Sequence, residues 1–185
     1  RKRGQRGGVR RRLRRYKTLL PLPSIILANT RSLRPKAPNY NFDELSANVS
    51  FMREFRDSCL LCFTETWFDD RVTDDSVYID GFGSPYRSDR DPTVSGKHHG
   101  GGVCLYVNEQ YCNRANVTVR EQLCTPDVDL LSVSMRPKYL PREFGQVFVT
   151  VIYTHPKANT ARAATEIADV VHSLQLVSPD APNFI

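Results

Sequence analysis

Apolar and polar positions alternate along the chain in blocks that predict short strands and two helices. Strands are predicted at 24–28 and 59–64, because each run is apolar at successive positions and therefore has both faces buried. Between them, apolar residues recur at steps of three and four through 42–55, the spacing of a helix that packs on a sheet. This strand–helix–strand order predicts a layered α/β fold.

The second half of the chain continues with the same kinds of element. Further strands are predicted at 103–107, 115–119, 128–134 and 147–152. The run 147–152 is apolar on both faces apart from Thr150, so we expect it inside a sheet. A helix is predicted over 160–176, and residues 183–185 begin another strand. One face of that helix carries Ile167, Val170, Val171 and Leu174.

Size and composition are those of one globular domain. The chain has 185 residues, of which 40% are hydrophobic and 25% charged, enough for a single core. No apolar run approaches the roughly 20 residues of a membrane span, and no signal peptide is visible. We therefore expect an intracellular protein with no membrane partner. Neither Arg1 nor Ile185 resembles a natural terminus, which indicates a fragment.

Positive charge is concentrated at the start of the sequence. Residues 1–17 hold ten Lys or Arg and no acid, which leaves 16 basic against 20 acidic residues in the remainder. We expect residues 1–20 to form a disordered basic tail that is attracted to nucleic acid. The same tail is also consistent with a nuclear address or a solubilising arm. Its densest part comprises Arg10, Arg11, Arg12, Arg14 and Arg15.

The cysteines and histidines do not form a metal-binding pattern in the sequence. Cys59 and Cys62 have zinc or redox spacing, but no second pair accompanies them. Core thiols in a reducing compartment explain them better. His98 and His99 are adjacent in a Gly-rich loop with no third ligand nearby, so we expect a polar loop there.

Three polar residues directly follow strongly apolar strands: Asn29, Glu65 and Tyr153. Neighbouring strand ends in an α/β sheet converge on one crevice, so these side chains are predicted to lie together. A carboxylate such as Glu65 at the end of a buried strand can hold a hard cation such as Mg²⁺. A solvated glutamate at a strand end has the same pattern, so the residues alone leave both interpretations open.

Several segments taken together resemble one enzyme family, the endonuclease/exonuclease/phosphatase proteins. The more specific resemblance is to the apurinic-type endonuclease domain of non-LTR (LINE-type) retrotransposons, and it runs from about residue 21 to 185. It is carried by Ala28-Asn-Thr-Arg-Ser-Leu33, Leu61-Cys-Phe-Thr-Glu-Thr-Trp67, Arg87-Ser-Asp-Arg90, Gly100-Gly-Gly-Val-Cys-Leu-Tyr-Val107, Val151-Ile-Tyr-Thr-His-Pro156 and Ser178-Pro-Asp-Ala-Pro-Asn-Phe-Ile185.

This resemblance implies a four-layered α/β sandwich of the DNase I-like kind, built of two similar halves. It implies hydrolysis of a phosphodiester with Mg²⁺ (or Mn²⁺), nicking target DNA for a reverse transcriptase domain elsewhere in the protein. Glu65 would bind the metal, Asn29 would join the polar network around the phosphate, and Tyr153 would support the phosphate. Arg87 and Arg90 are expected to contact the substrate.

The resemblance is incomplete at the end of the chain. In the family, the last strand continues into Gly-Asp-x-Asn, and a later segment brings Asp-His; the printed sequence stops at Phe184-Ile185. None of His98, His99, His155 and His172 matches the family histidine. We therefore expect residues 21–185 to be roughly the first half of the fold, with exposed sheet edges, and to be inactive alone.

Two other functions fit the sequence. The chain could be a non-enzymatic retroelement remnant that binds nucleic acid through its basic tail. It could also be a phosphatase of the same fold, acting on a lipid or a nucleotide. The Arg-rich tail and the Thr64-Glu-Thr-Trp67 segment favour a polynucleotide substrate.

Overall fold

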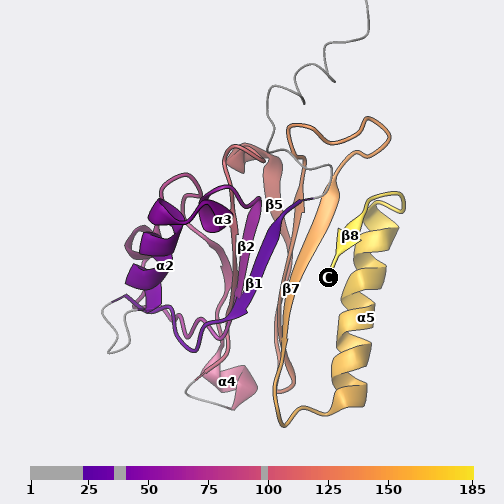
Figure 1. Ribbon diagram of the computed structural model, residues 1–185. Coiled ribbons are helices and arrows are strands. Elements are labelled where there is room, and N and C mark those ends of the chain that lie inside the picture. The colour runs from indigo at the N-terminus through magenta and orange to yellow at the C-terminus, as the bar shows by residue number, and fades with distance from the viewer. Residues whose placement is uncertain (1–22, 36–40, 97–99) are drawn as a thin grey trace, which may run out of the picture.

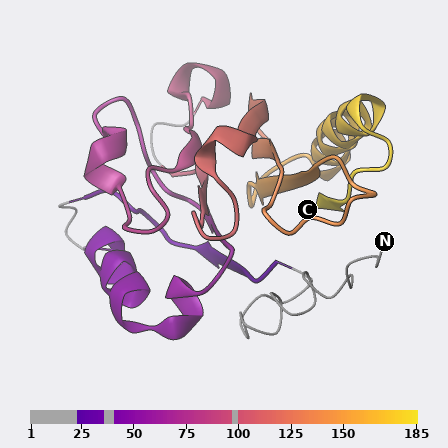
Figure 2. The same cartoon turned by 90° about the horizontal axis from the view of Figure 1, so that it is seen from above.

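The protein is a sandwich of two β-sheets between two layers of helices. The structure, a computed structural model, describes residues 23–35, 41–96 and 100–185. In Figure 1, α2 and α3 lie on one side of the sheets and α5 on the other. The view from above in Figure 2 gives the same order of layers. The predicted four-layered α/β sandwich is confirmed.

The first sheet has the strand order β1-β2-β4-β3. Its strands are β1 (Ile25–Asn29), β2 (Leu60–Thr64), β3 (Tyr86–Ser88) and β4 (Val103–Val107). β1 is parallel to β2, whereas β4 is antiparallel to both β2 and β3. Every residue of β2 and β4 is buried, as their apolar sequences predicted. The prediction that the strand at 24–28 is buried on both faces is wrong, because β1 lies at the edge of the sheet and the side chains of Ile25 and Leu27 are exposed.

The outer face of the first sheet is covered by α2 (Asn41–Phe51) and the short α3 (Arg53–Arg56). Phe42, Leu45 and Val49 pack against the outward side chains of β2 and β4. The prediction of one continuous helix through 42–55 is wrong at Met52, whose backbone is extended (φ −101°, ψ 120°) and whose side chain is exposed. The break turns the chain back toward β2, so only part of the apolar stripe reaches the core.

The second sheet has the order β5-β6-β7-β8. Its strands are β5 (Val117–Cys124), β6 (Val128–Met135), β7 (Val147–Thr154) and β8 (Asn183–Phe184). β7 is an interior strand, as predicted from its sequence. β5 extends well beyond the predicted 115–119, because its backbone pairs with β6 through a polar run, with an irregularity between Val119 and Glu121.

Helix α5 (Thr160–Val177) connects β7 to the parallel strand β8 and covers the outer face of the second sheet. Its residues Ala163, Ile167 and Val170 pack on Val128 and Leu130 of β6. The chain thus contains two strand–helix–strand units, β1-α2-β2 and β7-α5-β8, one on each outer face. Shorter turns lie in the connections: η1 (Asp74–Val77), α4 (Pro92–Ser95) and η2 (Arg114–Asn116).

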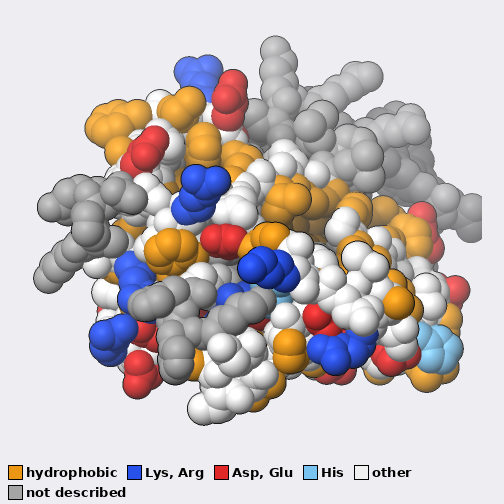
Figure 3. All heavy atoms as spheres, turned by 90° about the horizontal axis from the view of Figure 1, so that it is seen from below, with side chains coloured by type: hydrophobic (Ala, Val, Ile, Leu, Met, Phe, Trp, Pro, Cys, Tyr) orange, Lys and Arg blue, Asp and Glu red, His pale blue; other side chains and the backbone are white. Residues whose placement is uncertain are grey.

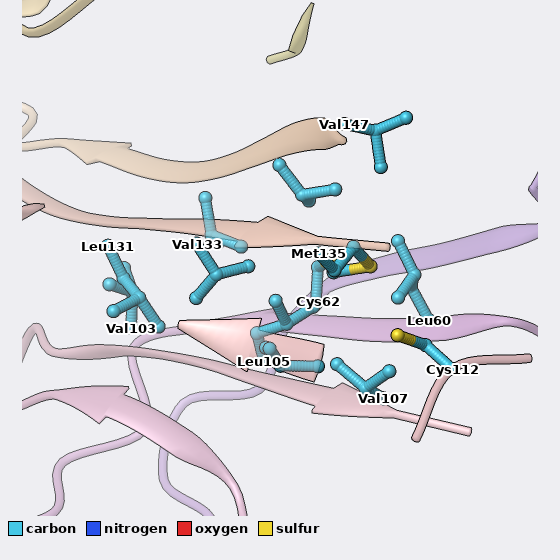
Figure 4. Close-up of a cluster of buried hydrophobic side chains, with 13 residues drawn as sticks. Leu60, Cys62, Val103, Leu105, Val107, Cys112, Leu131, Val133, Met135 and Val147 are labelled. Atoms are coloured by element: carbon cyan, nitrogen blue, oxygen red, sulfur yellow. The ribbon is translucent and has the colours of Figure 1, made fainter. Parts of the chain in front are cut away.

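The main core lies between the two sheets (Figure 4). It is formed by the inward side chains of β2, β4, β6 and β7, including Leu60, Leu105, Val133 and Val149. The prediction of core thiols is confirmed for Cys62, whereas Cys59 is only partly buried against this core; Cys104 is buried in the layer under α2. Cys112 is also buried, although its polar sequence context did not indicate this. No helix in the described ranges is long and apolar enough to cross a membrane.

Candidate functional site at the carboxyl ends of β1, β2 and β7

The carboxyl ends of β1, β2 and β7 lie at the same end of the sandwich, the lower end in Figure 1. Glu65 immediately follows β2, and Tyr153 is the penultimate residue of β7, in the other sheet. The Tyr153 hydroxyl donates a hydrogen bond to Oε1 of Glu65 across the gap between the sheets. The structure thus brings together two of the three strand-end residues that the sequence singled out.

Asn29, the third of these residues, ends β1 and is exposed. It is in register with Thr64, one position before Glu65, so it belongs to the same rim. Its Oδ1 accepts a hydrogen bond from the backbone N–H of Arg31 at 3.3 Å. The described contacts do not join Asn29 to Glu65 or Tyr153, and its role in catalysis stays a prediction.

The loops that follow β1 and β2 have an unusual backbone. Within the described ranges, the non-glycine residues with positive φ are Arg31 (47°), Ser32 (98°), Glu65 (55°) and Trp67 (57°), all in these two loops. Such conformations cost of order 1–3 kcal/mol each and concentrate at functional sites. They are held by a ladder of backbone bonds: Ser32 N to Glu65 O at 2.8 Å and Trp67 N to Gly101 O at 3.0 Å.

Asn41, the first residue of α2, also stabilises this backbone. Its side-chain amide donates to the carbonyl oxygens of Thr30 and Ser32, each at 2.8 Å. The helix that covers the outer face of the sheet therefore also fixes the loop after β1. Helix packing and site geometry are coupled through one side chain.

The carboxylate of Glu65 is held by two donors. Trp67 donates from its indole Nε1 to Oε2 at 3.2 Å, and Tyr153 donates to Oε1. Burial raises the pKa of Tyr153 to about 12, and the hydrogen bond to Glu65 adds to the shift. The phenol is therefore neutral near pH 7 and acts as a donor.

The carboxylate oxygens of Glu65 are ligands that fit a hard divalent cation of the Mg²⁺ type. Among the described residues there is no cluster of three or more His, Cys, Asp or Glu side chains, so no closed protein cage forms there. Mg²⁺ normally takes one or two carboxylates and completes its shell with water and substrate phosphates. Each oxygen of Glu65 accepts one side-chain donor and has a second lone pair, so the partly exposed carboxylate can still bind a cation.

The two arginines expected to contact the substrate are both engaged by the protein. Arg87 donates to Asp89, to the carbonyl of Val72 at 2.7 Å and to the carbonyl of Asp69 at 2.9 Å. Its guanidinium lies 4.9 Å from the centre of the Phe68 ring. These contacts are those of a structural arginine, and substrate binding by Arg87 stays a prediction.

Arg90 belongs to a buried charged cluster that the sequence did not reveal. We call Arg90, Asp129 and His155 the inter-sheet cluster. Nη2 of Arg90 lies 2.8 Å from Oδ2 of Asp129 and 2.6 Å from Nδ1 of His155. The signal that could have identified it is Asp129 itself, an acid inside the otherwise apolar start of β6.

An open hollow of about 540 Å³ lies beside Trp67, whose indole contacts Glu65; Glu65 itself does not line it. Trp67 and Phe68 contribute its aromatic lining, and charged residues of both signs, including Arg34, Asp69 and Arg71, surround them. Basic and acidic side chains are interspersed over this end of the molecule, which Figure 3 views from below. The basic tail of residues 1–20, with Arg10 to Arg15, and the pair His98-His99 lie outside the described residues.

Solved structures share the fold at low sequence identity. The catalytic domain of human Nocturnin with a bound sulfate anion matches with a TM-score of 0.52 and 12% identity, over 87% of this chain and 62% of that one. The endonuclease domain of TRAS1, a telomere-specific non-LTR retrotransposon, matches with a TM-score of 0.48 and 15% identity, over 80% of this chain and 54% of that one. A humanized D. rerio TDP2 matches with a TM-score of 0.49 and 13% identity, over 86% and 58%.

The likeness to the Nocturnin catalytic domain, with a TM-score above 0.5, supports the fold alone. The chain spans between 54% and 62% of the length of these three chains. No protein-family model matches the sequence, and neither does any curated protein.

Proposed function

We propose that the chain is part of a phosphodiesterase that acts on DNA with the help of Mg²⁺ or Mn²⁺. The observation that carries the proposal is the contact between Glu65 and Tyr153. The Glu65 carboxylate, on a strained backbone at the end of one sheet, receives a neutral hydroxyl from the other sheet, and its second partner, Trp67, lines an open hollow. A solvated structural glutamate has no need of this arrangement.

Each residue has a definite task in this proposal. Glu65 supplies the protein oxygen that binds the cation. When bound, the cation would offset negative charge that develops on the phosphate. Trp67 and Tyr153 hold the two carboxylate oxygens, which fixes the direction in which the cation would sit. Asn29, on the exposed rim, is suited to donate its amide to a phosphate oxygen.

Within this class, we propose the target-nicking endonuclease of a non-LTR retrotransposon. The segments Thr64-Glu-Thr-Trp67 and Gly100-Gly-Gly-Val103 support this choice, as does the basic run at residues 1–17, which suits a polynucleotide better than a small phosphate ester. A nuclear location and a reverse transcriptase domain in the same protein belong to this proposal. Groups that orient the attacking water would then come from parts of the protein other than these 185 residues.

The test is plasmid nicking by the protein that carries this sequence. We expect nicking of supercoiled DNA with Mg²⁺ or Mn²⁺ and none after chelation. Glu65→Gln should lower kcat by about 100-fold or more, because charge stabilisation by a metal is worth several kcal/mol. The same variant should weaken Mn²⁺ binding measured by electron paramagnetic resonance, a readout that does not depend on turnover.

Glu143→Gln is the matched control, since Glu143 is an exposed glutamate in the connection between β6 and β7, at the opposite end of β7. It should retain both nicking and Mn²⁺ binding. Full nicking activity in Glu65→Gln would remove Glu65 from the mechanism and contradict the proposal.

A further inference from the structure

The inter-sheet cluster is a group of charges buried where the two sheets meet. The side chain of Arg90 is 7% exposed, that of Asp129 1% and that of His155 2%. Burying a charge is costly unless it is paired and hydrogen-bonded, and apolar residues often serve stability equally well. Stability alone therefore does not explain this cluster, which points to a role in fixing the positions of neighbouring side chains.

The cluster joins the first sheet to the second at the end that carries Glu65. Arg90 follows β3, Asp129 is the second residue of β6, and His155 directly follows β7. Oδ2 of Asp129 also accepts the backbone N–H of Gly102 at 2.8 Å, just before β4. One carboxylate thus holds an arginine and a backbone amide of the first sheet against a strand of the second.

The same cluster contacts the site through Tyr153. The rings of Tyr153 and His155 meet edge to face, with centroids 5.1 Å apart. Tyr153 is also the direct cross-strand partner of Asp129 in the β6–β7 register. Because guanidinium nitrogens only donate, the His155 ring nitrogen that contacts Arg90 acts as the acceptor.

The glycine run supplies the space that Arg90 needs. Gly100, Gly101 and Gly102 all have positive φ, and a Cβ added to Gly101 would overlap the Arg90 guanidinium. The run is not followed by a helix, as a phosphate-binding loop would be, but by β4. Because these residues lack side chains, the planar guanidinium of Arg90 can lie against their backbone.

We propose that Arg90, held between Asp129 and His155, positions the Tyr153 hydroxyl against Glu65 and thereby sets the orientation of that carboxylate. The proposal rests on the proposed function for its effect on turnover. Arg90 is a positioning residue, because it contacts His155, whose ring packs on Tyr153, and Tyr153 donates to Glu65. The planar guanidinium lies flush against Gly101, a geometry that the tetrahedral ammonium of lysine does not reproduce.

The first test is kinetic. In the protein that carries this sequence, Arg90→Lys should lower kcat for nicking about tenfold or more and leave KM for DNA within about twofold, because supporting partners of a metal-binding residue typically contribute 10- to 100-fold. Lysine keeps a positive charge beside Asp129, which protects the fold. Asp129→Asn should have the same effect, and Gly101→Ala should reproduce it by displacing the guanidinium.

The second test does not require catalysis. The 185-residue chain has a single tryptophan, Trp67, whose indole N–H donates to Glu65. Its one indole resonance in a ¹⁵N–¹H spectrum therefore reports the position of the carboxylate. We expect this resonance to shift in Arg90→Lys and Asp129→Asn, even if the wild-type protein does not nick DNA.

Arg114→Met is the control. Arg114 also joins the two sheets, with its guanidinium 4.7 Å from the Tyr86 ring centre, but it lies beyond the far end of β4. It should leave kcat and the indole resonance unchanged. An unmoved indole resonance in Arg90→Lys, or equal shifts in Arg90→Lys and Arg114→Met, would overturn the proposal. A shifted resonance without wild-type nicking would keep it and reject the proposed phosphodiesterase.

Discussion

Single residues at this site combine ordinary chemistry with unusual backbone. Glu65 and Trp67 both have left-handed backbone conformations, and the indole of Trp67 donates to the carboxylate of Glu65. Tyr153 completes the arrangement from the other sheet with a hydroxyl that stays protonated. The roles assigned to these residues therefore depend on positions that only a rigid scaffold can maintain.

Tyr153→Phe removes one donor to Glu65 and should lower kcat for nicking by about 10- to 100-fold, because a hydrogen bond to a charged group contributes about 1.5–3 kcal/mol.

The raised pKa of Tyr153 also makes the stability of the fold depend on pH. The folded state favours the protonated phenol, so its contribution to stability is complete below the ordinary pKa of 10.0 and is lost as pH rises toward about 12.

Urea unfolding measured from pH 8 to 11.5 tests this pH dependence. The wild type should lose stability above pH 10 more steeply than Tyr153→Phe, which lacks this ionisation. Identical pH dependence in the two proteins would contradict the assigned pKa shift, and unchanged nicking would contradict the role of the hydroxyl.

At the scale of elements, helix α2 has two functions. Phe42, Leu45 and Val49 cover the outer face of the first sheet, and Asn41 holds the loop after β1. The loops of the site are thus tied to a packed helix rather than left mobile. The break at Met52 shows that three turns of helix are sufficient for this cover.

Leu45→Ala should lower the free energy of unfolding by about 2–5 kcal/mol, because it leaves a cavity between α2 and the sheet. Ser50→Ala, an exposed position on the same helix, should change it by less than about 0.5 kcal/mol. Urea titration followed by circular dichroism measures both. Equal stability of the two variants would show that α2 does not pack on the sheet as described.

At the scale of the whole molecule, the net positive charge comes from residues 1–17 and not from the rest of the sequence. The ten basic residues of 1–17 account for the positive net charge, whereas the rest of the chain has 16 basic and 20 acidic residues. The sandwich carries the candidate site, and the tail carries the electrostatic attraction expected for a phosphate polymer.

Deleting residues 1–17 should weaken binding to duplex DNA at ~50 mM salt and flatten the dependence of affinity on salt, because fewer counterions are released. Fluorescence anisotropy with a labelled duplex measures both quantities. The matched control replaces the same ten cations with glutamine and should behave like the deletion. Unchanged affinity at ~50 mM salt in either variant would exclude the tail from DNA binding.

The sequence by itself determined the elements whose signals are local. The apolar runs of β2, β4 and β7 and the helical stripe of α5 were readily predicted, because period and hydrophobicity are properties of neighbouring residues. The position of Glu65 and Tyr153 at strand ends also followed from those runs. The short β3 was missed, since only its pairing with β4 makes it a strand.

Tertiary structure alone decided that the three residues of the inter-sheet cluster meet. Arg90, Asp129 and His155 are as far as 65 residues apart in the chain, and only Asp129, an acid in an apolar run, stands out in its local sequence. Their contact depends on how two sheets face each other, a long-range packing outcome without a local periodic signal. The sequence predicted that Tyr153 and Glu65 lie close together, but only the structure shows the hydrogen bond between them, which spans 88 residues. Local pattern therefore predicts the layers, and the packing of the sheets creates the candidate site.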